Sequence, residues 1–397
     1  MARSRGLKAA AREAHSMRWY RVRVWLWVLA IFSGITAAGS TAMHAQTQAD
    51  SAATAFRRAQ ELKSGINLSN WFASGDLSPQ HLTTAVSEAD LAAIHAMGFD
   101  SVRIGVDPSL IERHGDLQPA NPAALATLHK AVDEALAAHL AVTLCIFPSD
   151  DYKHQLSSEW GVGELTETWR ILAASFAQTD ADHVFYELIN EPEVQDPYRW
   201  MGIEARLVEA VRSVDAQHTM IAAGASYSGL GDLLATEPVH DANVIYTFHF
   251  YEPYPFTHQG ATWGSAEWPF YRSIPYPATP QQITEQMKAV PSDLARYYLY
   301  LYAAGGWNAE TIAGRIAFAA AWGKECGVPV IANEFGVYRD TADAASRMRW
   351  LHDVRTAFES NGIGWTMWDY AGNFGVARRS GGKIEPDAAV LEALGLK

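Results

Sequence analysis

The stretch VFYELINEPE, Val184 to Glu193, decides the fold, because it reads as a buried strand that ends in a loop. Its aliphatic and aromatic side chains are typical of a strand covered on both faces, as in a parallel sheet, and Pro192 has no N–H to continue a ladder. A second run, VPVI from Val328 to Ile331, leads into ANEFG and is predicted to end in the same way. Glu191 and Glu334 are therefore expected at the carboxyl ends of two parallel strands, on one face of a sheet.

Eight strand-like runs, most of them followed by a helical pattern, alternate along the rest of the chain. The predicted strands are Lys63–Leu68, Phe99–Ile104, Leu140–Phe147, Val184–Ile189, Thr219–Ala223, Val244–Phe250, Val328–Ile331 and Gly364–Trp368. The predicted helices are Glu88–Met97, Ala123–His139, Glu164–Ala177, Trp200–Asp215, Thr311–Cys326 and Ala342–Ser360. This alternation predicts an α/β fold, a single (β/α)₈ TIM barrel over residues 61–397. A doubly wound sheet is the alternative, but no glycine-rich phosphate-binding motif follows a strand.

The segment from Glu252 to Asn308, after the sixth predicted strand, is longer than the other connections and rich in aromatic residues. Its rings are Trp263, Trp268, Tyr271, Tyr276, Tyr297, Tyr298, Tyr300, Tyr302 and Trp307. A long aromatic loop on the catalytic face of a barrel can form one wall of a substrate cleft. The alternative, for most of these rings, is a small subdomain with its own core.

The first 45 residues have the order of a secretory signal. Arginines precede the apolar run Val24–Ile35, and small residues follow up to Ala42 and Ala45, after either of which cleavage is expected. Residues 46–60 are then a polar leader before the predicted barrel. The apolar run is short for a bilayer span of about 20 residues, which favours a cleaved signal over a membrane anchor and predicts a secreted or periplasmic protein.

The charge of the mature chain argues against some classes of partner. Residues 1–42 carry seven Lys or Arg and one acid, so their removal changes the formal net charge from −13 to −19. Such an acidic protein is a poor partner for nucleic acid and anionic membranes, and is better suited to a neutral or cationic substrate. A monomer without stable membrane contact after signal cleavage is expected.

Cys145 and Cys326, the only cysteines, lie in or beside predicted core strands that are far apart in strand order. Two buried thiols are therefore expected rather than a disulfide. Two cysteines cannot form a cysteine-based metal site, and no HExxH or similar ligand cluster is present, so neither a metal nor another cofactor is expected. Serine nucleophile chemistry has no GxSxG motif to support it.

The two predicted glutamates are the residue type that glycoside hydrolysis requires. Cleavage with retention needs a proton donor and a nucleophile about 5 Å apart, and one environment cannot suit both. The donor needs a pKa raised by burial and by the charge of its neighbour, whereas the nucleophile must stay ionised. Arg103, which closes the second predicted strand, is expected at the same rim, where it can keep a carboxylate charged.

Six motifs along the chain resemble those of glycoside hydrolase family 5, the cellulase family within the clan of retaining barrels. They are GINLSNW (Gly65–Trp71), FDSVRI (Phe99–Ile104), ELINEP (Glu187–Pro192), FHFYEP (Phe248–Pro253), ANEFG (Ala332–Gly336) and WTMWDY (Trp365–Tyr370). The resemblance covers the predicted barrel strand by strand and in order. An Asn-Glu-Pro tripeptide alone is a weak signal, but this tripeptide at the fourth strand with Glu-Phe-Gly at the seventh is a strong combination.

The resemblance implies a role for each polar residue of these motifs. Glu191 would be the acid/base and Glu334 the nucleophile. Asn190 would bond the 2-hydroxyl of the sugar, a contact that matters most at the transition state, and Arg103 would orient Glu334.

The resemblance also implies that His249 sits beside the acid/base, that Tyr251 lies near the nucleophile, and that Trp368 forms the floor under the sugar at the cleavage point. The alternatives are a rim histidine with satisfied hydrogen bonds for His249 and an ordinary core residue for Trp368. Trp71, after the first strand, and Trp263, on the long loop, are the expected platforms for more distant sugars, since a glucan chain stacks its flat faces on rings.

One position departs from the family pattern. Family members often carry a histidine at the end of the third strand, where this chain has Phe147 and Pro148 in LCIFPSD. His154, a few residues later, is the candidate substitute. The departure leaves the reaction intact and leaves the identity of the substrate open.

Together these features predict a retaining, endo-acting β-glycosidase, first of all an endo-β-1,4-glucanase that acts on a β-glucan polysaccharide or oligosaccharide. A β-mannanase, xyloglucanase or exo-β-glucanase of the same family is the first alternative. A non-catalytic glycan-binding barrel in exopolysaccharide assembly is an alternative from another class, and it is disfavoured because a binding protein needs neither glutamate.

Overall fold

The structure is a computed structural model that describes residues 48–111, 121–380 and 383–397. The predicted signal at residues 1–45 lies outside the described residues. A compact unit runs from Ala52 to Lys397, so it begins within the predicted leader. Residues 52–58 are helical, and Arg58 is buried where it donates to the Gln217 carbonyl at 2.6 Å. The end of the leader is therefore packed against the barrel.

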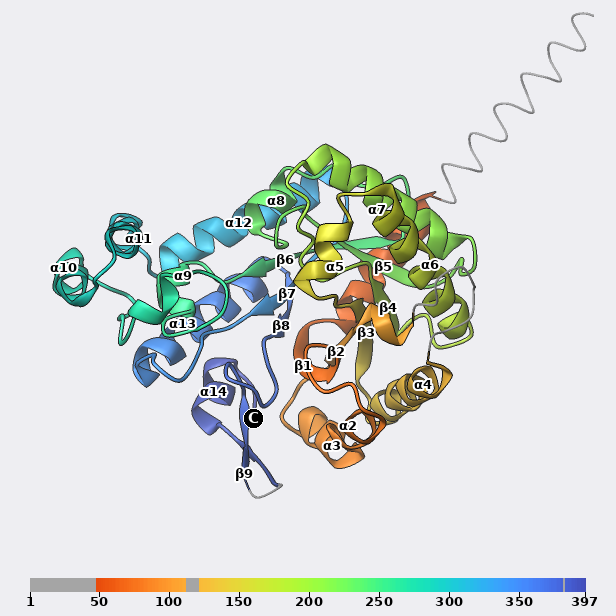
Figure 1. The fold of residues 1–397 in the computed structure, drawn as a ribbon, viewed down its shortest axis with the longest axis horizontal. Helices are drawn as coiled ribbons and strands as arrows, with labels where there is room; N and C mark the ends of the chain where they lie inside the picture. The colour runs from red at the N-terminus through yellow and green to blue at the C-terminus, as the bar shows by residue number, and fades with distance from the viewer. Residues whose placement is uncertain (1–47, 112–120, 381–382) are drawn as a thin grey trace, which may run out of the picture. The chain divides into compact units, whose positions relative to one another are not determined.

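Eight parallel strands close into a barrel in chain order, which confirms the predicted (β/α)₈ fold (Figure 1). The strands are β1 (Ser64–Phe72), β2 (Ser101–Val106), β3 (Ala141–Ile146), β4 (Val184–Glu187), β5 (Thr219–Ala223), β6 (Val244–Phe250), β7 (Val330–Phe335) and β8 (Gly364–Met367). The barrel closes between β1 and β8, where Gly65 is opposite Thr366. A Cβ at Gly65 would lie 2.6 Å from Thr366 Oγ1, so this closure requires glycine.

Nearly every residue of the eight strands is buried, because helices cover the outside of a parallel barrel and side chains fill its inside. One apolar cluster joins Phe185, Ile221, Ile245 and Ile331 to residues that precede β1. These four side chains come from early positions in their strands. The cluster therefore closes the amino end of the barrel and leaves the carboxyl end for the site.

Helices alternate with the strands around the barrel (Figure 1). The longer ones are α3 (Glu88–Ala96), α4 (Pro122–Ala137), α6 (Glu159–Phe176), α7 (Pro197–Arg212), α12 (Ala309–Cys326) and α13 (Ala344–Ser360). The shorter elements are η1 (Ala59–Glu61), α2 (Pro79–Thr84), η2 (Pro108–Leu110), α5 (Asp150–Gln155), α8 (Leu230–Leu234), the hairpin β9 (Ala377–Ser380) and β10 (Lys383–Pro386), and α14 (Ala388–Ala393). Capping side chains define the N-terminal ends of many helices. At α3, for example, Ser87 and Asp90 form a capping box.

The long segment after β6 is largely helical. It contains α9 (Tyr254–Thr257), η3 (Trp268–Phe270), α10 (Pro280–Ala289) and α11 (Asp293–Ala304), the last two at the left of Figure 1. Buried Gln259 holds the segment together, because its amide donates to the carbonyls of Phe256 and Ile274 and accepts from the N–H of Ile274.

The aromatic residues of this segment divide into two groups. Tyr271, Tyr276 and Tyr302 are buried, and each hydroxyl donates to a fixed acceptor, so the alternative of a subdomain core describes them. Others are exposed, among them Trp263 and Tyr300, and these present ring faces to solvent.

The structure also bears on membrane-spanning helices and on the state of the two cysteines. Within the part of the chain that the structure describes, no helix has the length and apolar character needed to cross a membrane. Cys145 and Cys326 are both free thiols, as predicted. Cys145 is buried, but Cys326 is only partly buried because it ends the outer helix α12, which corrects the expectation of two buried thiols.

Candidate active site

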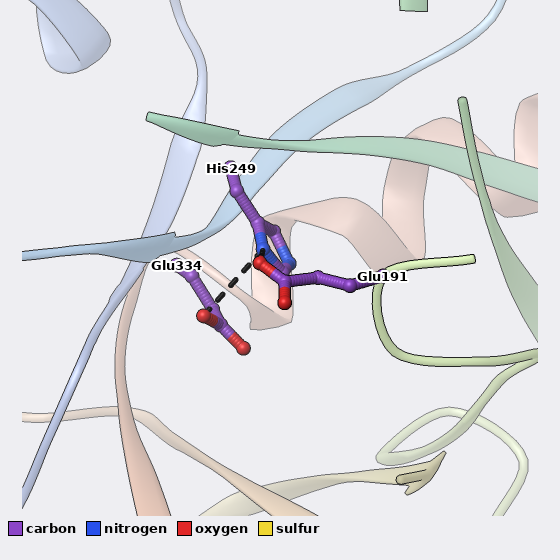
Figure 2. Close-up of side chains that lie close together, drawn as sticks. All are labelled: Glu191, His249 and Glu334. Atoms are coloured by element: carbon purple, nitrogen blue, oxygen red, sulfur yellow. Dashed lines mark hydrogen bonds and ion pairs between the residues drawn. The ribbon is translucent and has the colours of Figure 1, made fainter. Parts of the chain in front are cut away.

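The two predicted catalytic glutamates lie at the carboxyl end of the barrel and approach each other from different elements (Figure 2). Glu334 is the penultimate residue of β7. Glu191 lies in the loop after β4 with a φ of 47°, a left-handed conformation that a residue with a Cβ rarely adopts. Such a conformation persists where the surrounding structure imposes it, and here it directs the carboxylate toward Glu334.

The two carboxylates are close together. An oxygen of Glu191 and an oxygen of Glu334 lie within 4.8 Å of each other. Nδ1 of His249, on β6, lies 2.9 Å from Glu191 Oε1 and 3.5 Å from Glu334 Oε2. The histidine therefore contacts both acids, and it lies beside Glu191, where the family resemblance placed it.

Arg103, on β2, ties Glu334 to the inside of the barrel. Its Nη1 donates to Glu334 Oε1 at 2.6 Å. Its Nε and Nη2 donate to the two oxygens of Glu187 at 2.6 and 2.8 Å, a bidentate pair. All three side chains are buried, so one guanidinium compensates two carboxylates that burial would otherwise destabilise.

Two asparagines complete the contacts of Arg103. The guanidinium donates to Asn67 Oδ1 and to Asn190 Oδ1, each at 2.8 Å. Because the Asn190 oxygen accepts from Arg103, its amide nitrogen is the group left to donate to a ligand. Asn67 was not predicted as a site residue. A polar residue between Ile66 and Leu68 in an otherwise apolar strand was the available signal.

Tyr251, just after β6, donates from its hydroxyl to Glu334 Oε2 at 2.9 Å. Each oxygen of Glu334 therefore accepts a hydrogen bond, one from Arg103 and one from Tyr251. Burial is the largest influence and raises the pKa of Glu334 above its usual value, although the charges of His249 and Arg103 oppose it. The ionised form of Glu334 thus depends on these donors.

The pKa values of His249 and Glu191 shift in opposite directions because the two side chains are hydrogen-bonded to each other. Burial opposes the charged form of Glu191, but the hydrogen bond and the positive charge of His249 prevail, and the pKa of Glu191 lies below its usual value. Burial also lowers the pKa of His249, but the charges of Glu334 and Glu191 outweigh it and leave that pKa raised. The sequence led us to expect a raised pKa for Glu191, so in the unliganded site the direction is the opposite one.

The profile of the family described as "Cellulase (glycosyl hydrolase family 5)" matches residues 64–374, which include the whole barrel and every residue of the site described above. The chain belongs to glycosyl hydrolase family 5. The resemblance of its six motifs to this family is thereby confirmed.

Curated proteins similar to this family 5 chain include two endoglucanases. Endoglucanase 3 of Fibrobacter succinogenes is 27% identical over 340 residues, which cover 79% of this chain and 50% of that protein. Endoglucanase C of Acetivibrio thermocellus is 26% identical over 318 residues, which cover 78% of this chain and 91% of that protein. The match therefore spans half the length of the first relative and most of the second.

Solved structures of Thermotoga maritima Cel5A share the fold. Those in complex with cellobiose and with mannotriose each match with a TM-score of 0.69 at 23% identity, over 85% of this chain and 99% of that one. At this identity the likeness establishes the fold, and the chemistry has to be argued from the residues of the site.

An aromatic contact occupies the position where family 5 members often carry a histidine. The ring of Phe147 stacks on that of Trp368, with centroids 5.8 Å apart and an interplanar angle of 17°. His154 is exposed, and its Nε2 lies 3.6 Å from Glu193 Oε2. His154 therefore pairs with Glu193, and the expectation that it replaces the missing histidine gains no support from its contacts.

Trp368 and Trp263 border one aromatic cluster. Tyr251, Tyr338 and Phe374 form this cluster, and Trp368 packs against it from the end of β8. Trp263 packs on Tyr338 at a centroid distance of 5.1 Å and is 46% exposed. Both rings thus lie on the side of the site that holds Glu334, and Trp263 presents a face to solvent.

The structure places Trp71 in the core, which contradicts its predicted role as a sugar platform. The strand β1 continues to Phe72, beyond its predicted end at Leu68, so Trp71 belongs to the barrel and not to a loop. Its side chain is 3% exposed, and its indole N–H donates to the Leu82 carbonyl at 3.0 Å. A ring buried in this way cannot stack on a sugar.

Glu191, His249 and Glu334 are also the described residues with the spacing to surround a cation, since one ligand atom from each lies within 4.8 Å of the others. Both oxygens of Glu334 already accept hydrogen bonds from Arg103 and Tyr251, and Arg103 places a permanent positive charge 2.6 Å from one of them. These contacts suit an acid and nucleophile pair better than a metal ligand set.

Proposed function

We propose that this chain is a retaining, endo-acting β-glycosidase, and specifically an endo-β-1,4-glucanase. The observation that carries the proposal is the approach of the Glu191 and Glu334 carboxylates to within 4.8 Å. Retaining enzymes keep the two groups about 5–5.5 Å apart, whereas inverting enzymes leave about 6.5–9.5 Å for a water molecule. The names of the relatives Endoglucanase 3 and Endoglucanase C support the choice of a β-1,4-glucan.

Two displacements account for the reaction. In the first, Glu334 attacks the anomeric carbon while Glu191 gives a proton to the departing glycosidic oxygen, which leaves a glycosyl ester on Glu334. In the second, Glu191 takes a proton from a water that attacks the same carbon and frees Glu334. Arg103 and Tyr251 hold the two oxygens of Glu334, so the nucleophile is oriented in the first step and stabilised as the leaving group in the second.

His249 supplies the proton that Glu191 needs. The directions of the pKa shifts favour the ion pair of His249 and Glu191 before substrate binds. A bound sugar displaces water and presents a neutral glycosidic oxygen, which favours the uncharged pair of carboxylic acid and imidazole. Transfer across the 2.9 Å hydrogen bond then converts Glu191 into the acid.

The remaining site residues position the glucan. Asn190 donates from its free amide nitrogen to the 2-hydroxyl, where the contact strengthens as the transition state forms. Trp368 lies under the sugar at the cleavage point, and Trp263 stacks on a sugar farther along the chain. A platform away from the cut suits an enzyme that binds inside a chain rather than at its end.

A second candidate substrate is a β-mannan, because Thermotoga maritima Cel5A has been solved with mannotriose as well as with cellobiose. Phe147 stands where family members often carry a histidine and stacks on Trp368, so this departure leaves the choice between the two sugars open. Carboxymethyl cellulose, mannan, xyloglucan and laminarin, tested side by side, separate a glucanase from a mannanase, a xyloglucanase and an exo-β-glucanase. Cleavage of none of them would favour the glycan-binding barrel.

We also propose a secreted or periplasmic monomer that works without a metal or cofactor and does not bind nucleic acid. The signal-like order of residues 1–45 and the acidic charge of the mature chain support this proposal.

Chemical rescue tests the two roles. Glu191→Ala should lose the least activity on substrates with good leaving groups. Azide should restore the turnover of this variant, with a β-glycosyl azide as the product. Glu334→Ala should be nearly inactive on every substrate. Glu193→Gln is the matched control, since Glu193 pairs with Lys153 and His154 and not with the catalytic acids, and its activity should stay within about tenfold of wild type. Near wild-type turnover by both alanine variants would refute the assignment.

A further inference from the structure

A cavity of about 610 Å³ lies between the segment after β6 and helix α12, outside the set of residues that surrounds the catalytic glutamates. Its volume is within the range of small-molecule sites. The side chains that matter for its chemistry are Glu252, Tyr254, Trp268, Tyr298, Trp307 and Arg315.

One layer of rings separates this cavity from the catalytic centre. The ring of His258 lies 4.9 Å from that of Tyr251, which bonds Glu334, and 4.3 Å from that of Trp268, which lines the cavity. Neither Glu191 nor Glu334 lines it. A ligand in this cavity therefore occupies a site distinct from the point of cleavage.

Aromatic rings form most of the wall. Tyr254 and Trp268 are nearly parallel, with an interplanar angle of 4° and centroids 6.1 Å apart. On α11, Tyr298, Leu301 and Tyr302 are spaced three and four residues apart and so face the cavity together. The hydroxyl of Tyr302 is occupied by the Pro275 carbonyl, which fixes that ring as part of the floor.

The wall also offers polar groups suited to hydroxyls. The indole N–H groups of Trp268 and Trp307 make no hydrogen bond to any residue that the structure describes, and Tyr298 is exposed. Arg315 forms an ion pair with Glu252, and the two side chains are 42% and 23% exposed. The Trp350 indole donates to the Glu252 carbonyl at 3.1 Å and holds that backbone in place.

The ion pair gives the wall no net charge, so it favours neither an anionic nor a cationic ligand. The cavity thus combines flat ring faces, the two free indole N–H groups and a neutral ion pair. This combination suits a ligand that has apolar C–H faces and hydroxyl groups at its edges. We propose that this cavity binds a neutral glucan oligosaccharide, as a second glycan site beside the catalytic cleft. The choice of a β-1,4-glucan rests on the proposed function.

Binding to a catalytically inactive protein tests the second site. In the Glu334→Gln background, calorimetry with cellotetraose should give two equivalents bound per chain. Adding Trp307→Ala or Tyr298→Ala should remove one equivalent and leave the affinity of the other within about twofold. Tyr300→Ala is the matched control, because Tyr300 is 57% exposed on α11 but does not line the cavity, and it should leave two equivalents.

One equivalent in the Glu334→Gln parent, or two that survive both cavity variants, would overturn the second site. Using two cavity variants keeps the test decisive if one of them fails to fold. A dimer in solution that dissociates on Trp307→Ala would assign the cavity to a second copy of the chain instead. Turnover of an aryl cellobioside by the unmodified protein tests the proposed function by itself, so an active enzyme that binds one equivalent refutes only the second site.

Discussion

His249 donates from Nδ1 to Oε1 of Glu191 across 2.9 Å, and this hydrogen bond decides which of the two residues holds their shared proton. In the unliganded site the raised pKa of His249 and the lowered pKa of Glu191 place the proton on the histidine. In the proposed mechanism, the first step requires that the pair hold this proton, on either residue. The basic limb of the pH profile should therefore report the pair and not an isolated carboxyl group.

Replacing His249 by asparagine tests this relationship. The amide can still donate to Glu191 but carries no charge, so the basic limb should report Glu191 alone. Glu191 then loses the positive charge of His249, which lowers its pKa, but the charges of Lys153 and Arg103 still lower it. We expect this pKa to stay below that of the intact pair, so the basic limb of kcat/KM should move to lower pH. We also expect kcat to fall about tenfold or more. A pH profile on an aryl cellobioside measures both, and an unmoved basic limb would show that His249 does not hold the proton.

Tyr251→Phe removes the hydroxyl that donates to Glu334 Oε2 at 2.9 Å. This hydrogen bond opposes the rise that burial causes in the pKa of Glu334, so its loss should raise that pKa further and move the acidic limb of kcat/KM to higher pH. A hydrogen bond to a charged group contributes about 1.5–3 kcal/mol, which corresponds to a loss of roughly 10–100-fold in kcat/KM.

Tyr186→Phe is the control for Tyr251→Phe. Tyr186 also donates to a carboxylate, that of Asp215 at 2.9 Å, but neither residue contacts the catalytic glutamates. This variant should lower stability and leave the acidic limb in place. If both variants move the acidic limb of kcat/KM equally, then a general loss of packing, and not the loss of the hydrogen bond to Glu334, causes the change.

The strands and their order could be predicted because most barrel strands are apolar runs flanked by turns, a local signal. Ends of strands depend on neighbours that are distant in sequence. The strand β7 was predicted to stop at Ile331, but it continues to Phe335, since a register irregularity in its pairing with β6 lets His249 pair with Glu334. Glu334 is therefore part of the strand and not of the loop after it.

The site residues that carry charge could be named from the motifs, but their states of protonation could not. The direction of the pKa shift of Glu191 depends on His249, which is 58 residues away in the chain and is brought to 2.9 Å only by the barrel. The burial of Trp71 was missed for the same kind of reason, because its partner, the Leu82 carbonyl, lies on a helix that the sequence did not place against β1.

Trp263 and Trp71 make a matched pair of tryptophan substitutions. Trp263→Ala removes an exposed ring at the edge of the site, so kcat/KM on cellopentaose should fall by roughly tenfold or more, about 1.4 kcal/mol, with a much smaller effect on an aryl cellobioside. Trp71→Ala removes a buried ring and should lower the free energy of unfolding by about 3–5 kcal/mol. Equal losses of Trp263→Ala on long and short substrates would show that this ring supports the loop and does not bind sugar.

Glu204, on α7, is fully buried away from the active site, and it predicts a pH dependence of stability. Its Oε1 accepts from the Ala223 N–H at 3.0 Å, and its Oε2 has no partner among the described residues. Burial raises the pKa of Glu204 to about 8. The folded protein therefore binds a proton that the unfolded chain releases above its usual carboxyl pKa, so the contribution of Glu204 to stability is fully present below about pH 4.5 and is lost as the pH rises toward 8.

Glu204→Gln cannot ionise, although its extra N–H is buried without a partner. At pH 4.5 the variant should therefore be no more stable than wild type. Between pH 4.5 and pH 8 its free energy of unfolding, relative to that of wild type, should rise by several kcal/mol, since each unit of pKa shift corresponds to about 1.4 kcal/mol. Urea unfolding at the two pH values measures the difference, with Glu209→Gln on the exposed face of the same helix as control. If Glu204→Gln and wild type lose stability in parallel as the pH rises, then Glu204 is not ionising in this range, and other groups set the alkaline limit of the fold.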